Sequence, residues 1–197
     1  DIGKFKAHLR VLRLDGWNHF IAKSYSIQGD FEKALDYQTQ SLEIYEEIEY
    51  KRGKAIALHS IGLIHQDQDE YEKAMDFYSQ SLKIKEEIGD KSGIAGTLLS
   101  IGNTYFDQEH YSLALENYVQ SLKIQEQIGD KSGIANSLNC ISMIYKVQGN
   151  YSKALEYASR SLSVAQEMGG VSLTRDASRS LWENNKATGR YKEALFM

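Results

Sequence analysis

The chain has 197 residues, of which 42% are apolar and 25% are charged, a composition typical of globular proteins. Its formal net charge of −4 speaks against a nucleic-acid-binding surface, which normally carries a basic patch. The single cysteine, Cys140, excludes an intrachain disulfide, and no apolar run approaches the length of a membrane span. Proline, the strongest helix breaker, is absent, which favours a chain that is helical nearly throughout.

The sequence repeats itself every 40 residues without insertion or deletion, the interval between the two copies of GDKSGIA at Gly89–Ala95 and Gly129–Ala135. An aromatic residue and an alanine recur at the same interval: Phe31, Tyr71, Tyr111, Tyr151 and Tyr191; Ala34, Ala74, Ala114, Ala154 and Ala194. In chain order we therefore predict the end of an earlier helix, four repeats and a partial fifth. Their residues are 1–8, about 9–48, 49–88, 89–128, 129–168 and 169–197.

Within each repeat, the apolar spacing predicts two helices. In the third repeat, residues 94–106 place one apolar face at helical spacing, and so do residues 111–128. The segment 107–110 between them is polar, and other repeats have Gln-Gly-Asp or Gln-Gly-Asn there, which are turn residues. Each repeat is thus predicted to be a hairpin of two antiparallel helices, here called helix A and helix B.

The junctions between repeats carry helix stop and start signals. Gly89 can adopt the left-handed conformation that ends helix B, and Asp90 can cap the next helix A. Gly93 lies early in helix A, where a side chain would hold neighbouring helices apart. The junction at residues 49–53 lacks the stop glycine, and we expect it to be looser.

A single helical hairpin buries too little surface to be stable alone, so successive hairpins are expected to stack along a shared apolar seam. Stacking with a small constant rotation leaves a concave and a convex side. We therefore predict an all-α solenoid. Its seam is expected to contain Tyr71, Tyr111, Tyr151, Leu82, Leu122, Ile61 and Ile101.

This pattern of small and large residues resembles the tetratricopeptide repeat over essentially the whole chain. In the third repeat it reads Leu98, Ile101-Gly102, Tyr105, Glu109, Tyr111, Ala114, Tyr118 and Ser121. The resemblance implies a right-handed superhelix of antiparallel hairpins. The usual repeat has about 34 residues; the longer period here and the missing proline are similar to those of kinesin light chains and bacterial signalling arrays. Trp182 stands where earlier repeats have Gly62 and Gly102, so we expect a distorted fifth hairpin or a terminal capping helix.

The resemblance also implies that helix A lines the concave groove, with defined inward positions in each repeat. These positions vary between repeats, whereas the seam does not. They are His19, Lys23, His59, Leu63, Gln66, Leu99, Asn103, Phe106, Asn136, Asn139, Met143 and Lys146. The centre of this strip is apolar, and its amides offer a donor and an acceptor to the backbone of an extended peptide. An ordinary mixed surface stays open as the alternative.

No residue pattern indicates catalysis, a metal or a cofactor. The histidines form no metal-binding motif, Cys140 has no recurring histidine beside it, and no glycine-rich loop is placed to hold a phosphate. We therefore expect a chain that is not an enzyme and needs no cofactor.

Two functions remain, and both concern protein partners. The first is a non-catalytic scaffold that binds a peptide or helix of another protein in the groove. The alternative is a sensory or regulatory segment of a larger bacterial signalling protein with a kinase, cyclase or transcription-regulator output. We expect a protein or peptide ligand, neither nucleic acid nor membrane, and possible self-association through open solenoid ends. The chain reads as a fragment of a longer protein, expected in the cytoplasm with the periplasm left open.

Overall fold

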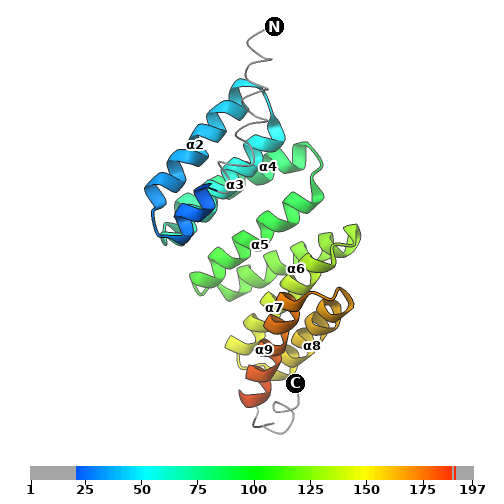
Figure 1. Ribbon diagram of the computed structural model, residues 1–197. Helices are drawn as coiled ribbons and strands as arrows, with labels where there is room; N and C mark the ends of the chain where they lie inside the picture. The colour runs from blue at the N-terminus through cyan, green and yellow to red at the C-terminus, as the bar shows by residue number, and fades with distance from the viewer. Residues whose placement is uncertain (1–20, 188, 190–197) are drawn as a thin grey trace. The chain divides into compact units, whose positions relative to one another are not determined.

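The computed structural model describes residues 21–187 and residue 189, and these residues contain helices and no strand (Figure 1). A helical segment at residues 21–27 precedes the numbered helices. These are α2 (Phe31–Glu47), α3 (Lys51–Asp67), α4 (Tyr71–Glu87), α5 (Lys91–Asp107), α6 (Tyr111–Ile128), α7 (Lys131–Val147), α8 (Tyr151–Glu167) and α9 (Val171–Ala187). The predicted all-α architecture of helix hairpins is confirmed. None of the described helices is both long and apolar enough to cross a bilayer.

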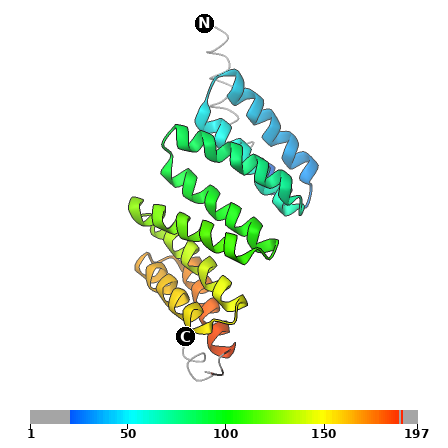
Figure 2. The ribbon, with the colours of Figure 1, turned by 180° about the vertical axis from the view of Figure 1, so that it is seen from behind.

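The chain folds as two compact units, and the boundary between them falls inside α5, between Ser100 and Ile101. In the first unit, α3 packs against both α2 and α4. In the second unit, α7 packs against α6, α8 and α9, as Figure 2 shows from behind. Each helix therefore finds its partners close by in the sequence, as expected of a stack of hairpins.

Glycines of helix A make room for tyrosines of helix B inside each of two hairpins. A Cβ added to Gly62 would lie 2.6 Å from Cε1 of Tyr78, and one added to Gly102 would lie 2.6 Å from Cε1 of Tyr118. The two tyrosines are only 0% and 2% exposed. Because the helices cross at contact distance over these rings, a larger side chain at either glycine would separate them.

The predicted stop and start signals of the junctions are confirmed. Gly89 has a φ of 68°, in the left-handed region, and the Gly93 amide donates a 3.0 Å hydrogen bond to Oδ1 of Asp90. A Cβ on Gly93 would lie 3.0 Å from Cδ of Lys85, so this glycine lets the side chain of the preceding helix B pass over the start of helix A. Gly129 ends α6 in the same way, with a φ of 70°.

The junction without the stop glycine follows the same backbone path. Glu49 adopts the left-handed conformation there, with a φ of 58°. Tyr50 occupies the N-cap position of α3 and provides no side-chain hydrogen bond to the helix. This junction therefore keeps the turn but has a less suitable residue in the left-handed position and no side-chain cap.

The predicted seam is partly wrong. Ile61, Ile101 and Leu122 are buried, at 3%, 8% and 8% exposure. The recurring tyrosines that begin helix B are only half-buried: Tyr71, Tyr111 and Tyr151. As the first residue of its helix, each lies at the end of a hairpin, where fewer neighbours cover it.

Stacked aromatic rings join the two helices of three hairpins, a feature that sequence analysis missed. The ring centroids lie 5.8, 5.3 and 5.5 Å apart in Tyr25–Tyr37, His65–Phe77 and Tyr145–Tyr157. Each pair connects the end of helix A to the first turns of helix B. In the third repeat Asn117 occupies the helix B position, and that hairpin lacks the aromatic partner there.

The last described helix ends at Ala187. The predicted second helix of the fifth hairpin and its distortion therefore lie outside the described residues. Residues 1–8 and the start of the first repeat also lie outside them. Trp182 is 42% exposed, and the Lys186 ammonium lies 5.1 Å from the centre of its ring.

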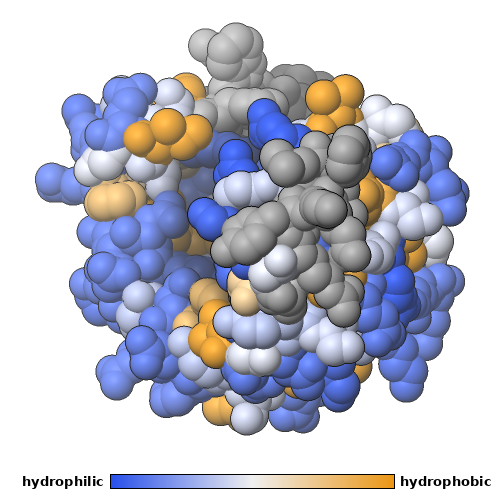
Figure 3. Space-filling model, turned by 90° about the horizontal axis from the view of Figure 1, so that it is seen from below, coloured by the Kyte–Doolittle hydropathy of each residue, from blue (hydrophilic) through white to orange (hydrophobic). Residues whose placement is uncertain are grey.

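Figure 3, seen from below, shows mostly polar and charged side chains among the coloured atoms, with apolar side chains in small groups between them.

Candidate functional site

The predicted groove residues within the described range lie on helix A of each repeat. Lys23, Leu63, Asn136 and Met143 are exposed. The half-buried ones are His59, Gln66, Leu99, Asn103, Phe106, Asn139 and Lys146. His19 lies outside the described residues. Lys23 to Leu99 belong to the first unit and Asn103 to Lys146 to the second, so each unit is considered separately.

The second unit brings four of the predicted residues around one pocket of about 390 Å³. Phe106 comes from α5, and Asn139, Met143 and Lys146 come from α7. The other lining residues are Val147 on α7 and Asp176, Arg179, Ser180 and Glu183 on α9. The Lys146 ammonium donates to the Glu183 carboxylate, so an ion pair between α7 and α9 borders an otherwise partly apolar pocket.

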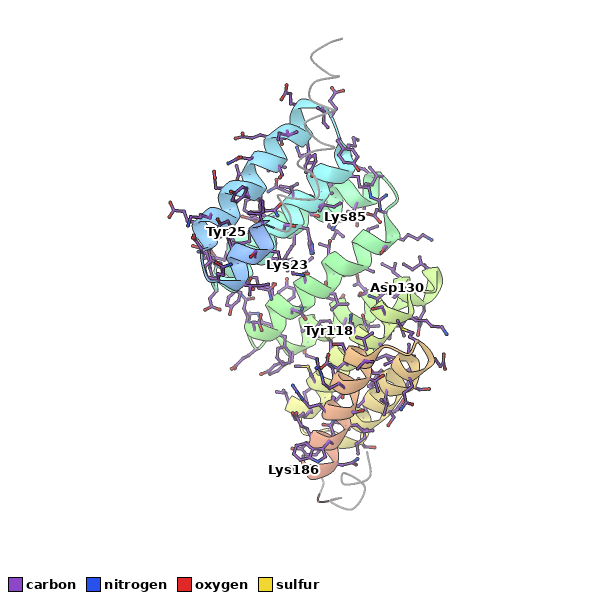
Figure 4. The ribbon with its side chains drawn as sticks, viewed as in Figure 1. Lys23, Tyr25, Lys85, Tyr118, Asp130 and Lys186 are labelled. Carbon is purple, nitrogen blue, oxygen red and sulfur yellow. The ribbon has the colours of Figure 1, made fainter. Side chains whose placement is uncertain are left out.

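The first unit has a smaller pocket of about 280 Å³ between the helical segment at residues 21–27 and α3. Of the predicted residues it contains Lys23, exposed on this surface (Figure 4), and Leu63. The remaining lining residues are Ala22, Ser26, Ile27, Gln38, Ser60, Ile64 and Asp67. The Ser26 hydroxyl donates to Oδ2 of Asp67 over 2.9 Å and joins the two helices at the rim.

The two pockets occupy the same position in the repeat, although they belong to different units. Residues of the first pocket at positions 23, 26, 27, 60 and 63 correspond, 120 positions later, to lining residues of the second: Met143, Lys146, Val147, Ser180 and Glu183. In each unit the pocket therefore lies between one helix A and the next helix A.

Sequence analysis missed the contribution of α9 to the second pocket. Arg179 and Glu183 stand 40 residues after Asn139 and Met143. Applying the same period to the partial fifth repeat would have identified both. Both are charged, whereas Asn139 and Met143 are neutral, so the pocket has a charged wall on the α9 side.

Two predicted amides are committed to the core through their oxygen atoms. Oε1 of Gln66 accepts a 2.8 Å hydrogen bond from the Tyr78 hydroxyl, and Oδ1 of Asn103 accepts one of 2.8 Å from the Tyr118 hydroxyl. One of the two lone pairs of each amide oxygen is therefore used within the chain, and the expectation that these amides bind a peptide stays a prediction. A buried phenol needs an acceptor, and each amide supplies it.

Asn139 differs from those two amides. Its Oδ1 is buried and has no hydrogen-bond partner among the described residues. It lies on α7 beside the second pocket, so a donor that reaches this oxygen would satisfy a polar atom that the described part of the chain leaves unmatched.

His59 connects two A helices in the first unit. Its Nδ1 lies 3.3 Å from Oγ1 of Thr97 on α5, and its ring centre lies 5.3 Å from that of Tyr78. Sequence reasoning treated His59 as a surface side chain, whereas the structure shows it half-buried against α4 and α5.

The described residues offer no obvious nucleophile or metal centre. Burial raises the pKa of the Cys140 thiol to about 11, which disfavours the thiolate that nucleophilic chemistry needs. Tyr118 contacts this thiol, and burial raises the pKa of its phenol as well. No group of His, Cys, Asp and Glu side chains in the described range is arranged to hold a metal ion.

Comparison with known proteins extends these observations. The family model of the tetratricopeptide repeat matches residues 13–87, 53–127 and 93–167, which together span well over half of the chain. The comparison with curated proteins gives no match.

Solved structures share the fold at low sequence identity. BtubC (BKLC) from P. vanneervenii is 17% identical with a TM-score of 0.81, over 97% of this chain and 82% of that one. A Rap protein complexed with Competence and Sporulation Factor is 20% identical with a TM-score of 0.78, over 91% of this chain and 50% of that one.

A third structure is a Signal Transduction ATPase with Numerous Domains (STAND) protein with a tetratricopeptide repeat sensor, from Pyrococcus horikoshii. It is 20% identical with a TM-score of 0.77, over 97% of this chain and 29% of that one. This chain therefore spans only half of the Rap protein and less than a third of the STAND protein.

Proposed function

Because this chain belongs to the tetratricopeptide repeat family, whose fold is generally a non-catalytic scaffold for protein–protein interaction, we propose that it binds a peptide or helix of a partner protein along its A helices. We further propose that it has no catalytic activity of its own. The predicted groove residues His19 to Lys146 are the candidate contact residues.

The observation that carries this proposal is the pocket of the second unit, where four residues selected from the sequence line one pocket of about 390 Å³. Phe106 and Met143 provide apolar surface for an anchor side chain of the partner. Met143 is 40% exposed, which is more than a core methionine would be. The pocket thus combines an apolar patch with polar and charged side chains that could orient a partner.

Polar groups around the pocket would orient the partner. The exposed amide of Asn136, one helical turn before Asn139 on α7, offers a donor and an acceptor to the partner's backbone. The Lys146–Glu183 ion pair is about one-third exposed on each side, so a charged group of the partner can compete for either member. We expect a dissociation constant on the order of micromolar, about −8 kcal/mol.

Affinity capture from the source cell, followed by titration of the captured partner or its peptides, tests the proposal. The double variant Phe106→Ala with Met143→Ala should weaken binding by tenfold or more, because it removes the apolar contact. The matched control is Leu113→Ala with Val119→Ala on α6, which removes apolar side chains of 43% and 46% exposure that do not line the pocket. Equal binding by both double variants would place the interaction elsewhere.

A second candidate is a regulatory segment of a larger signalling protein. Its support is the similarity to the STAND protein with a tetratricopeptide repeat sensor and to the Rap protein complexed with Competence and Sporulation Factor. An assay of the full-length protein with and without the captured partner distinguishes the two functions. An output activity that changes when the partner is added favours regulation. Binding without any such change favours a passive scaffold.

Two further expectations remain part of this proposal. Self-association through the ends of the repeat stack would appear as concentration-dependent sedimentation.

We propose that the protein works in the cytoplasm, where a free thiol such as Cys140 persists. Cell fractionation checks this compartment.

A further inference from the structure

Lys85 is a buried lysine in the first unit, at the place where α4 meets α5 (Figure 4). It is 5% exposed, and its Nζ donates a 2.7 Å hydrogen bond to Oγ1 of Thr97, which is 0% exposed. None of the ion pairs within the described range includes Lys85. An ammonium in this position has lost hydration without gaining a carboxylate in contact, which disfavours the charged form.

The groups that face Lys85 come from two neighbouring elements. From α3, the Nδ1 of His59 lies 3.3 Å from the same Thr97 oxygen. From the turn before α5, Asp90 caps the helix and favours the ammonium through its charge. Burial is the larger effect and lowers the pKa of Lys85 to about 8.

The next junction of the same chain shows that this position does not require a charge. Gln125, 40 residues after Lys85, passes over Gly133 as Lys85 passes over Gly93. Gln125 is 3% exposed, and its Oε1 accepts a 2.7 Å hydrogen bond from the Ser137 hydroxyl. A neutral amide therefore fills the same space with its polar end satisfied.

We propose that Lys85 is a proton-dependent switch that sets how firmly the first turns of α5 pack on α4 in the first unit. As an ammonium, Lys85 donates to Oγ1 of Thr97, and the Thr97 hydroxyl proton is directed to the carbonyl oxygen of Gly93, 2.9 Å away, or to His59. As a neutral amine, Lys85 can instead accept the hydroxyl proton of Thr97, and no charge remains buried.

The direction of the effect follows from proton binding. The pKa of Lys85 is about 8 in the folded chain and 10.5 in its ordinary state, so the opened junction binds more protons between these values. The folded junction is therefore stabilised as the pH rises through this window. Below the window Lys85 is protonated in both states, so its titration gives the stability no pH dependence. Between pH 8 and 9.5 the fraction of opened junction should fall about tenfold.

The switch has a consequence for binding that rests on the proposed function, because His59 and Leu99 belong to the proposed contact surface. Loosening α5 would displace Leu99, which lies on α5, relative to His59, which lies on α3. The test below measures proton binding and stability alone, so its outcome is independent of whether a partner binds this surface.

The test compares the pH dependence of stability in three chains: wild type, Lys85→Gln, which copies Gln125, and Lys83→Gln, which removes the same charge from an exposed position on α4. The ratio of unfolded to folded first unit is measured by urea unfolding at pH 8 and 9.5. NMR of the lysine Cε signals follows the titration of Lys85 directly. The reciprocal variant Gln125→Lys introduces the charge at the next junction.

In the wild type and in Lys83→Gln, the ratio of folded to unfolded first unit should rise about tenfold more between pH 8 and 9.5 than it does in Lys85→Gln. Gln125→Lys should transfer a similar pH dependence to the second unit. A Lys85 titration midpoint at pH 10 or above, or an equal pH dependence in Lys85→Gln, would overturn the proposal. The NMR titration of the wild type decides the matter even where a variant does not fold.

Discussion

At the scale of single residues, the left-handed turn positions determine how well each hairpin closes. Gly149 ends α7 with a φ of 74° and has no atom near a built Cβ, whereas Glu109 adopts the corresponding conformation after α5 with a φ of 61°. Glu109→Gly should stabilise the chain by about 1 kcal/mol and Gly149→Ala should destabilise it by a similar amount. Urea unfolding measures both; a loss of stability in Glu109→Gly would show that its side chain matters more than its backbone.

The same scale shows what the sequence could and could not predict about residues. Gly89 and Asp90 were identified correctly because their roles depend on local backbone chemistry alone. Gln66 and Asn103 were assigned only to the groove, because their bonds to Tyr78 and Tyr118 depend on how two helices pack. A repeat pattern gives the face of a helix on which a side chain stands, not the hydrogen bond that it finally makes.

At the scale of helices, the packing of small against large residues holds each hairpin together. The Gly102–Tyr118 pair corresponds to Ser142–Ala158 in the next repeat, where the Ser142 hydroxyl donates to the carbonyl of Ala154 over 2.8 Å. Gly102→Ser alone should destabilise the second unit by about 1–3 kcal/mol through overpacking. Tyr118→Ala alone should cost about 3–5 kcal/mol through a cavity.

Combining the two changes reproduces the pair that the chain already uses. The loss of unfolding free energy in the double variant should be smaller than the sum of the two single losses by about 0.5–3 kcal/mol. The reason is that the serine fills part of the space that the ring leaves. Urea unfolding of all four chains gives this coupling energy. Strict additivity would mean that the two side chains do not compete for the same space.

Helix positions were predicted well because they depend on periodicity. The helix expected at residues 111–128 is α6, and the one expected at 94–106 is α5, which begins three residues earlier at Lys91. The stacked pair Tyr145–Tyr157 was not predicted, since two aromatic residues 12 positions apart show no contact until the turn between their helices is built.

At the scale of the whole molecule, contacts are local in sequence, so the two units should respond separately to core damage. Ile64 on α3 and Ile144 on α7 stand at the same position of their repeats and are 4% and 0% exposed. Either substitution to alanine should cost its own unit about 2–5 kcal/mol. NMR signals of each unit, followed in urea, should show the damaged unit unfolding first; simultaneous loss of all signals would contradict this.

The sequence predicted the repeat architecture and the family across the described residues, but not the division inside α5. The period is uniform through residues 89–128, and nothing in its spacing marks Ser100 as a boundary. The charged wall of the second pocket was likewise not predicted, because it comes from Arg179 and Glu183 in the partial fifth repeat, to which the inward positions had not been extended.

The fit of a long side chain over a glycine at the junctions after α4 and α6 limits which repeat the chain can lose. Excising residues 91–130 would join Lys85 to Gly133, and the two surfaces would still match. Excising residues 131–170 would set Gln125 against Leu173, which occupies the place of the glycine, and two bulky groups would collide. We therefore expect a chain without residues 91–130 to keep a well-packed junction and a chain without residues 131–170 to be destabilised there, which urea unfolding of the two deletion variants would check.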